Sequence, residues 1–537
     1  MAEFRAADLV ARRLYEAGCR HAFGMPGGEV LTIVDALEKA GIAFHLVKHE
    51  NAGGFMAEAV HHVDGAPAVL VATVGPGLMN AVNVVANAEQ DRVPMVVLTG
   101  CLDADEALTY THQVLDHRAV LDPITKATFT LTAGEAETIA DKAVSIALER
   151  RQGPVLIDVP IAVADAPATP KRRRRVPPST VAPAGEKFKL VRDWLSGAER
   201  PLIVAGLDVL ADDAAPALQA FAEQFEIPVV TTYKAKGVLP EDHPLALGGA
   251  GLSPLADQHL LPLVKQADVI FLVGYDPIEM RPGWREVWDV TKQCVVDFQA
   301  VENTHYMHQA GISFTCHIGA ALEAIMDVKQ AATRWRGGEP AAVKAALAQA
   351  FPKDDDWGPA GVIAEARAAL PPETRISIDS GAHRILLSQM WEAPYPKAVI
   401  QSSGLCTMGC AVPMAIGLAL AEPDRPAVAF VGDGGFLMSP GDLTTAAELG
   451  LKPIIITFVD ASLALIEKKQ RERQLTNAGV DYEHRHNFAA LGRAMGGAGV
   501  NVTNRAELRA AIEQALTADT FTVIAAQIDR GGYDGRI

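Results

Sequence analysis

Short runs of hydrophobic residues, each followed by a glycine or aspartate and then by a helical pattern, recur along the whole chain. Because these runs are apolar throughout, they are typical of parallel strands covered by helices on both faces. The pattern predicts an α/β protein with three doubly wound parallel-sheet domains. The predicted strands lie within 44–50, 68–74, 94–100, 155–160, 201–206, 227–233, 268–274, 293–298, 374–381, 398–404, 427–434, 453–460 and 521–529.

Two stretches without hydrophobic periodicity divide the chain. Residues 166–187 concentrate proline and charge, and residues 334–359 contain RWRGGEP and KDDDWGP around a short alanine-rich segment. Such composition is typical of linkers. We therefore expect domains at 1–165, 188–330 and 356–537, each of ordinary size.

The charge balance excludes several classes of partner. The 537 residues include 48 Lys and Arg against 65 Asp and Glu, a net charge of −17. This sign disfavours broad contact with nucleic acid or anionic membranes. The one basic run, 171–175 (KRRRR), sits among prolines, and we interpret it as a solvated linker. No run reaches the ~20 apolar residues of a membrane-spanning helix, and the start of the chain does not resemble a secretion signal. We expect a cytoplasmic protein without nucleic-acid or membrane partners.

The cysteines predict neither disulfides nor a metal centre. Six cysteines in 537 residues are too few for a secreted disulfide scaffold. Cys406 and Cys410 form a CxxxC in an apolar, glycine-rich stretch, without a second pair or histidines at metal-binding spacing. We interpret both as packed thiols.

The strongest chemical pattern lies at two strand ends of the third segment. One predicted strand ends in Gly432-Asp433-Gly434-Gly435, and the next ends at Asp460, 27 residues after Asp433. A right-handed crossover brings both ends to the same edge of a parallel sheet. Glycine backbone beside a helix N-terminus suits a bulky anion, and carboxylates beside a diphosphate suit Mg²⁺. The alternative is a simple strand-to-helix turn in which Asp433 caps the helix.

This pattern resembles the thiamine diphosphate (ThDP) binding motif, a GDG triplet followed at about this distance by an asparagine. The first and middle segments also resemble this enzyme family, in the family's order. The resemblance covers essentially the whole chain and points to carboligases of the acetolactate synthase type. The matching stretches outside the third segment are 21–37, 47–60, 72–100, 112–116 and 231–251.

The resemblance implies ThDP and Mg²⁺ as cofactors. Glu50, which closes the predicted strand 44–50, matches the glutamate that bonds to the pyrimidine ring and promotes cofactor ionisation. Asp433, Asp460 and the backbone carbonyl of Ser462 match the magnesium ligands. From the residues alone, Glu50 is also consistent with a helix-terminal charge that complements the helix dipole.

The resemblance also implies further contacts to the cofactor. Met408 occupies the place of the apolar residue wedged beneath the bent cofactor, and Gln113 matches a glutamine near the thiazolium and substrate. Each has a purely structural alternative, Met408 in a core and Gln113 in an exposed loop. The other implied contacts are Gly27, Gly75, Asn80, Gly404, Gly432, Gly434, Gly435 and Leu465.

In this family the pyrimidine-binding and diphosphate-binding domains that share one cofactor belong to different subunits. The resemblance therefore implies that Glu50 of one chain works with Asp433 of its neighbour. A C2 homodimer is then the minimum, and a homotetramer of two dimers is the usual outcome.

Three features depart from the family pattern. Asp460 replaces the usual asparagine, which adds a negative charge and puts the magnesium affinity in question. Lys469 stands where anabolic synthases have a tryptophan. A lysine at this place suits a substrate with a second acidic group. Alternatively, Lys468, Lys469 and Arg471 simply face solvent. Residues 274–282 (GYDPIEMRP) lack the arginine-rich flavin signature, so we expect no FAD.

Three functions remain open from the sequence. The first is decarboxylation of a 2-oxo acid with carboligation to a second carbonyl, and the second is non-oxidative decarboxylation or 2-hydroxyacyl lyase chemistry. Pyruvate decarboxylases carry a paired histidine motif, but His61 and His62 lack its context, and we interpret them as surface residues of a helix. The third is a non-catalytic ThDP-binding relative, which Asp460 favours and Glu50 disfavours.

Overall fold

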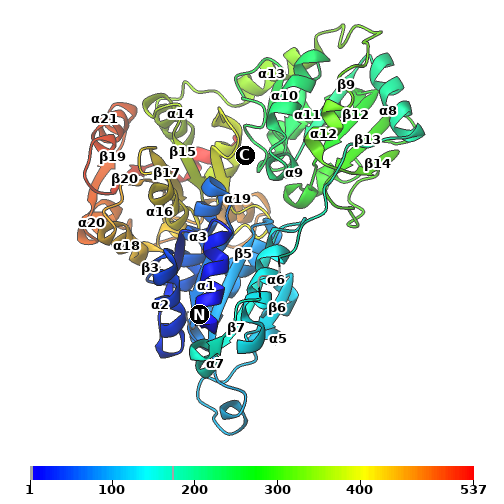
Figure 1. Ribbon diagram of the computed structural model, residues 1–537. Coiled ribbons are helices and arrows are strands. Elements are labelled where there is room, and N and C mark those ends of the chain that lie inside the picture. Colours follow the sequence, from blue (N-terminus) through cyan, green and yellow to red (C-terminus); the bar gives the residue numbers. More distant parts are fainter. Residues whose placement is uncertain (1–3, 172–173) are drawn as a thin grey trace.

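A computed structural model describes residues 4–171 and 174–537 and contains three successive six-stranded parallel sheets (Figure 1). Each sheet is flanked by helices, which confirms the predicted α/β architecture of three doubly wound sheets. Residues 1–3 and Arg172–Arg173 of the basic run lie outside the described residues.

The N-terminal sheet has the strand order β3-β2-β4-β5-β7-β6. Its strands are β2 His21–Met25, β3 Ala43–Leu46, β4 Ala68–Ala72, β5 Met95–Cys101, β6 Ala127–Thr130 and β7 Pro154–Pro160. Its helices are α1 Ala6–Glu16, α2 Leu31–Ala40, α3 Glu50–Asp64, α4 Pro76–Gln90, α5 His117–Leu121, α6 Ala136–Leu148 and α7 Ile161–Asp165. A short antiparallel pair, β1 Phe4–Arg5 with β8 Pro167–Ala168, joins the two ends of this unit.

The central sheet has the order β11-β10-β9-β12-β13-β14. Its strands are β9 Pro201–Ala205, β10 Val229–Thr231, β11 Ala246–Gly249, β12 Val269–Val273, β13 Cys294–Gln299 and β14 Ile312–Thr315. Its helices are α8 Glu186–Gly197, α9 Asp208–Ala211, α10 Ala215–Gln224, α11 Pro254–Gln266, α12 Ile318–Glu323 and, beyond the sheet, α13 Glu339–Ala350.

The C-terminal sheet has the order β16-β15-β17-β18-β20-β19. Its strands are β15 Arg375–Ile378, β16 Val399–Gln401, β17 Ala427–Gly432, β18 Ile454–Val459, β19 Ala498–Val502 and β20 Thr522–Gln527. Its helices are α14 Pro359–Ala369, α15 Ala382–Met390, α16 Ala411–Ala421, α17 Asp433–Phe436, α18 Leu443–Glu448, α19 Ala464–Glu472, α20 Phe488–Ala494 and α21 Arg505–Leu516. The crossover from β17 to β18 includes α18, as expected.

The N-terminal and C-terminal sheets share one hydrophobic core. Helix α3 packs against α16, and Phe55 and Met56 lie in the same buried cluster as Met414 and Ile416. A Cβ atom on Gly417 would lie 2.4 Å from the carbonyl oxygen of Met56, so only glycine allows the two helices to approach this closely. The helix that begins with Glu50 is therefore held rigidly by both domains.

Two interpretations of this helix are wrong. Strand β3 ends at Leu46, so Glu50 does not close a strand but is the first residue of α3. The preceding residue, His49, is the N-cap of this helix, and its Nδ1 accepts a hydrogen bond of 3.2 Å from Asn51 N. His61 and His62 are not surface residues, because the packing of α3 encloses them. His61 is 8% exposed and its Nδ1 lies 2.8 Å from the carbonyl oxygen of Ala66. Burial lowers the pKa of His61 to about 4.

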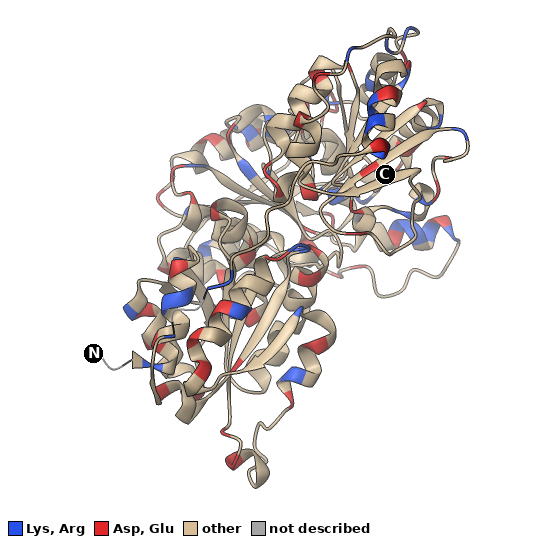
Figure 2. Ribbon diagram, turned by 45° about the vertical axis from the view of Figure 1, so that its right-hand side comes forward, with Lys and Arg blue, Asp and Glu red and all other residues tan. Residues whose placement is uncertain are grey.

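The described residues of the basic run are paired with acidic side chains. Lys171, Arg174 and Arg175 are exposed, and each forms an ion pair with a glutamate of α6 or its flanks. Lys and Arg are interspersed with Asp and Glu over all three sheets and their helices (Figure 2). Among the described residues, no helix is both long enough and apolar enough to cross a bilayer.

Candidate cofactor site

A cavity of about 300 Å³ lies at the carboxyl ends of β15, β17 and β18. The chain turns in opposite directions from β15 to β16 and from β17 to β18, so the cavity occupies the switch point of this sheet. Doubly wound sheets bind their ligands at such points. Most of the lining comes from the C-terminal domain, and Leu252 and Arg281 of the central domain add one wall.

The two predicted magnesium ligands face each other across neighbouring strand ends. Asp433 Oδ2 accepts a hydrogen bond of 2.7 Å from Ala461 N, and Asp460 Oδ1 accepts bonds from Ser462 N at 2.9 Å and Ser462 Oγ at 3.0 Å. Both carboxylates are buried. Burial, and then the charge of Asp433, raise the pKa of Asp460 to about 7. The N-cap of α17 is Gly432, so Asp433 is not the cap residue of this helix but its first residue, and its Oδ1 accepts a hydrogen bond of 2.8 Å from Gly434 N.

Two close and buried carboxylates fit a divalent cation. Each repels the negative charge of the other, and a cation between them would relieve this repulsion. No group of three or more His, Cys, Asp or Glu side chains with metal-binding geometry occurs in the described part of the chain. Two carboxylates together with backbone and external oxygens could supply a donor set of hard oxygens, which is what Mg²⁺ requires.

The glycines beside Asp433 keep the cavity open. A Cβ atom on Gly434 would lie 2.7 Å from the hydroxyl of Tyr482, and one on Gly432 would lie 3.4 Å from His383 Cε1. At Gly435 a side chain is excluded by the protein interior and not by the cavity, because a Cβ atom there would lie 2.7 Å from Oδ1 of the buried Asp379. At Gly432 and Gly434 only backbone therefore lines the cavity, at the place where a phosphate would sit.

Two polar side chains that the sequence analysis missed lie on the same wall. His383 is 3% exposed, its Nε2 has no partner, and its ring stacks on Phe458 at 5.3 Å between centroids. Burial, and then the charge of Arg384, lower the pKa of His383 to about 3, so its imidazole is neutral. The buried hydroxyl of Ser380 is also unpartnered. Ser380 lies two residues after β15, and His383 lies in the first turn of the helix that follows it, α15. Polar residues shortly after a strand at a switch point could have indicated this part of the site from the sequence.

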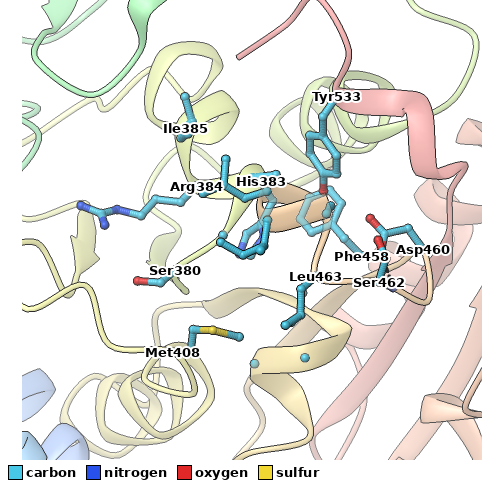
Figure 3. A pocket seen from close by; sticks show the side chains of 18 of the residues that line it. Ser380, His383, Arg384, Ile385, Met408, Phe458, Asp460, Ser462, Leu463 and Tyr533 are labelled. Carbon is cyan, nitrogen blue, oxygen red and sulfur yellow. Dashed lines mark hydrogen bonds between the residues drawn. The ribbon is translucent and has the colours of Figure 1, made fainter. Parts of the chain in front are cut away.

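The apolar side of the cavity includes Met408 and Leu465, as expected. Figure 3 shows Asp460 and Ser462 on one side of the cavity, and Met408 and Leu463 below His383. Cys406 also lines the cavity, and the expectation that it is a packed thiol is wrong. It is exposed with a φ of 55°, and its sulfur accepts a hydrogen bond of 2.9 Å from Arg384 Nη1. Cys410 is buried, as predicted.

Lys469 does not line this cavity. It is exposed on α19, as is Arg471, while the partly buried Lys468 pairs with Glu472. In a single chain, Lys469 and Arg471 therefore face solvent, which was the alternative interpretation of this charged helix. Two arginines that the sequence analysis did not select do line the cavity, Arg281 of the central domain and Arg384 of α15.

A second cluster of predicted residues lies at the edge of the N-terminal sheet. Glu50 is 2% exposed, and its Oε2 accepts a hydrogen bond of 2.9 Å from Asn80 Nδ2. Gly75 has a φ of 65°, and its N–H donates to His117 Nε2 at 3.0 Å. A Cβ atom on Gly75 would lie 3.1 Å from the carbonyl oxygen of Gln113, which is exposed with a φ of 59°. Glu50, Gly75, Asn80 and Gln113 are thus neighbours through direct contacts.

Gly27 follows β2 at the same edge. A Cβ atom there would lie 2.2 Å from Thr73 Oγ1, a residue that directly follows β4. None of Gly27, Glu50, Gly75, Asn80 and Gln113 is among the residues that line the cavity beside Asp433. Within one chain, the structure therefore presents two separate half-sites.

Comparisons with known proteins identify the class. Residues 4–120, 189–325 and 379–526 match the family models for the thiamine pyrophosphate enzyme N-terminal TPP binding domain, central domain and C-terminal TPP binding domain. The chain therefore belongs to the thiamine pyrophosphate enzyme family. The fold is that of a putative thiamin diphosphate-dependent enzyme from Mycobacterium smegmatis, with a TM-score of 0.83, 21% identity, and coverage of 98% of this chain and 100% of the other.

Within this family the chain is acetolactate synthase-like. It is 27% identical to an acetolactate synthase of Bacillus subtilis (strain 168), over 98% of this chain and 93% of that protein. It is 28% identical to the acetolactate synthase isozyme 1 large subunit of Escherichia coli (strain K12), over 98% and 94%. It is also 28% identical to a probable 2-ketoarginine decarboxylase of Pseudomonas aeruginosa, over 91% and 88%.

Proposed function

We propose that the protein is a ThDP- and Mg²⁺-dependent carboligase that decarboxylates a 2-oxo acid and joins the remaining fragment to a second carbonyl compound. The observation that carries this proposal is the pair of buried carboxylates, Asp433 and Asp460, beside glycine backbone that lines the cavity at the switch point of a sheet. We expect no FAD in this function.

The C-terminal half-site would hold the diphosphate end of the cofactor. Asp433 and Asp460, with the backbone carbonyl of Ser462, would bind Mg²⁺. The diphosphate would lie next to this ion, against the backbone of Gly432 and Gly434. The diphosphate would also give the unpaired Nε2 of His383 a hydrogen-bond partner. The negative charge of the diphosphate would favour the imidazolium form of His383, which donates a hydrogen bond.

The N-terminal half-site would hold the pyrimidine end. When bound, ThDP supplies a nucleophilic carbon and an electron sink for decarboxylation. Glu50 would hold the proton shared with a ring nitrogen, and Asn80 orients its carboxylate through the 2.9 Å bond. Gly27 and Gly75 would leave room for the ring. Met408 and Leu465 would shape the other side of the cofactor, with Gly404 behind them in the loop that carries Met408, and Gln113 would orient the substrate.

Because the half-sites are separate within one chain, a complete site requires two chains. Large apolar side chains are exposed beside both half-sites: Leu46 at 48% and Met79 at 46% near Glu50, and Leu437 at 37% and Met438 at 62% after α17. Exposed apolar residues of this kind mark interfaces. We propose a C2 homodimer in which Glu50 of each chain reaches the Asp433 cavity of the other, with a homotetramer as the larger assembly.

Non-oxidative decarboxylation or lyase chemistry is the second candidate, favoured by the similarity to a probable 2-ketoarginine decarboxylase. A non-catalytic ThDP-binding protein is the third. The buried Glu50–Asn80 pair argues against it, because a buried acid without a catalytic role is costly to maintain.

A product screen separates these functions. The protein with ThDP and Mg²⁺ is given pyruvate, glyoxylate, oxaloacetate and sulfopyruvate, singly and in pairs, and CO₂ release and product masses are recorded. A condensation product supports carboligation, and CO₂ with an aldehyde alone supports simple decarboxylation. ThDP binding without CO₂ or product supports the non-catalytic reading. A D433N variant is the control for activity from contaminants.

A further inference from the structure

The loop that carries Met408, residues 402–408 and here called the Met408 loop, is held from outside its own domain. It follows β16, and two of its residues, Cys406 and Met408, line the cofactor cavity. Its polar backbone groups are bonded to the C-terminal end of α4, a helix of the N-terminal domain of the same chain. This inference rests on the proposed function, since it concerns the site that would bind ThDP.

Asp91, the residue that follows α4, makes the most direct contacts. Its Oδ1 accepts a hydrogen bond of 2.7 Å from Gly404 N, and its Oδ2 accepts one of 3.1 Å from Ser403 N. Asp91 is 2% exposed, and its Oδ2 also lies 3.1 Å from the ammonium of the buried Lys234 of the central domain. A buried, charge-assisted pair of this kind fixes geometry strongly.

Asn87, one turn earlier on α4, holds the other end of the loop. Its Oδ1 accepts a hydrogen bond of 2.6 Å from Ser402 Oγ, and Ser402 Oγ accepts one of 2.8 Å from Thr407 N. The Nδ2 of Asn87 donates to Glu58 Oε2 on α3 at 3.0 Å, so the asparagine cannot rotate freely. Thr407 precedes Met408, and this chain of bonds therefore fixes the backbone next to the methionine.

Gly404 explains how the loop approaches α4 so closely. A Cβ atom on Gly404 would lie 2.7 Å from Gln90 Cβ and 3.2 Å from Asp91 Oδ1. Any larger residue would push the loop away from Asp91. The contacts of Gly404 in this chain are thus to α4, and Gly404 is not among the residues that line the cavity.

The same helix serves the other half-site at its opposite end. Helix α4 begins after Gly75 and carries Asn80, which bonds to Glu50, and it ends with Asn87 and Asp91 against the Met408 loop. Its 15 residues span about 22 Å. We propose that Asn87 and Asp91 are positioning residues for Met408, so that α4 supports the pyrimidine half-site of one cofactor and the apolar wall of another. The two cofactors belong to the two sites of the dimer.

The test compares D91N and S402A with a matched control, S377A. Ser377 is a buried serine of the same domain whose Oγ donates to the carbonyl of Ala411 at 2.7 Å, and it touches neither α4 nor the loop. S402T keeps the hydroxyl and is the conservative variant. Hydrogen exchange of the loop amides is measured in the protein without cofactor. ThDP affinity is measured by calorimetry with saturating Mg²⁺.

The proposal predicts amide exchange at least ~10-fold faster at Ser403 or Gly404 in D91N and at Thr407 in S402A, because D91N replaces one of the two acceptor oxygens of Asp91 and S402A removes the acceptor hydroxyl. ThDP affinity should fall about 10-fold in both, as expected for one lost buried hydrogen bond, and S402T and S377A should behave as wild type. Unchanged ThDP affinity, with or without faster exchange, would overturn the proposal. A wild-type protein that does not bind ThDP would instead refute the proposed function, while the exchange data still report on the loop.

Discussion

The carboxylates of Asp433 and Asp460 end neighbouring parallel strands, and Asp433 accepts a hydrogen bond from the residue directly after Asp460. The family motif that this chain resembles usually has an asparagine at the second place, and Asp460 adds one negative charge to that pattern. Arg530 lies beside that charge, since its Nη2 donates to the carbonyl of Ala461 at 2.8 Å. This cation, together with the proposed Mg²⁺, would offset the extra charge of Asp460.

This arrangement predicts different effects for the two aspartates. D433N should weaken Mg²⁺-dependent ThDP binding at least ~10-fold, because it removes a charged ligand. D460N makes the same change, but at the place where the family motif usually has an asparagine, and should weaken binding by less than D433N. Calorimetric titration of Mg²⁺ at fixed ThDP measures both, and D519N, an exposed aspartate of the same domain, is the control. Equal losses in D433N and D460N would contradict this assignment.

Glu50→Gln should reduce product formation at least ~10²-fold while ThDP still binds, because it removes one acid–base group and keeps the shape of the side chain. Turnover and ThDP affinity are measured separately. Glu38→Gln, at an exposed glutamate of the same domain, is the control. Unchanged turnover in the Glu50 variant would exclude Glu50 from the mechanism.

Met408→Ala should lower turnover at saturating ThDP about 10-fold or more, because the cofactor loses the apolar support that fixes its geometry. Met408→Leu conserves volume and should retain most of the activity. Steady-state kinetics with saturating ThDP distinguish the two variants. If alanine and leucine are equally active, Met408 has only a packing role.

Asp442 predicts how stability depends on pH. Burial raises the pKa of this carboxyl to about 6, although Lys48 N donates a hydrogen bond of 3.0 Å to it. The folded state therefore holds this proton more tightly than the unfolded state. Protonation of Asp442 therefore stabilises the folded state by at most about 3 kcal/mol. This stabilisation is fully present below about pH 4 and is lost as the pH rises to about 6.

Denaturant unfolding of wild type and D442N between pH 4 and 7 checks this prediction. Asparagine keeps an acceptor for Lys48 N but does not titrate. The free energy of unfolding of the wild type, relative to D442N, should decline with rising pH across this window. A difference that is independent of pH would show that Asp442 has no raised pKa.

The strand ends were the most predictable part of this protein. Continuous apolar runs identify buried parallel strands, and the crossover rule then places Asp433 and Asp460 at one edge without further information. His383 was missed because a histidine after a strand has no distinctive local pattern. Its meaning depends on a cavity that several distant segments form together.

The errors have separate physical origins. His61 is 8% exposed and the His62 side chain 14% exposed, and both lie near Lys234 and Lys397, which are far away in sequence. Cys406 was assigned to a core from its apolar neighbours, but a φ of 55° turns it into the cavity. The domain limits 1–165, 188–330 and 356–537, the cytoplasmic location and the absence of FAD stay predictions.

Subunit complementation tests most directly whether Glu50 of one chain completes the Asp433 cavity of another. E50Q and D433N should each be inactive as homodimers, but a mixed dimer combines the intact Glu50 of one chain with the intact Asp433 of the other in one of its two sites. Coexpression with random pairing should therefore restore about a quarter of wild-type activity. Activity no higher than the sum of the two separate variants would contradict a cofactor site shared between chains.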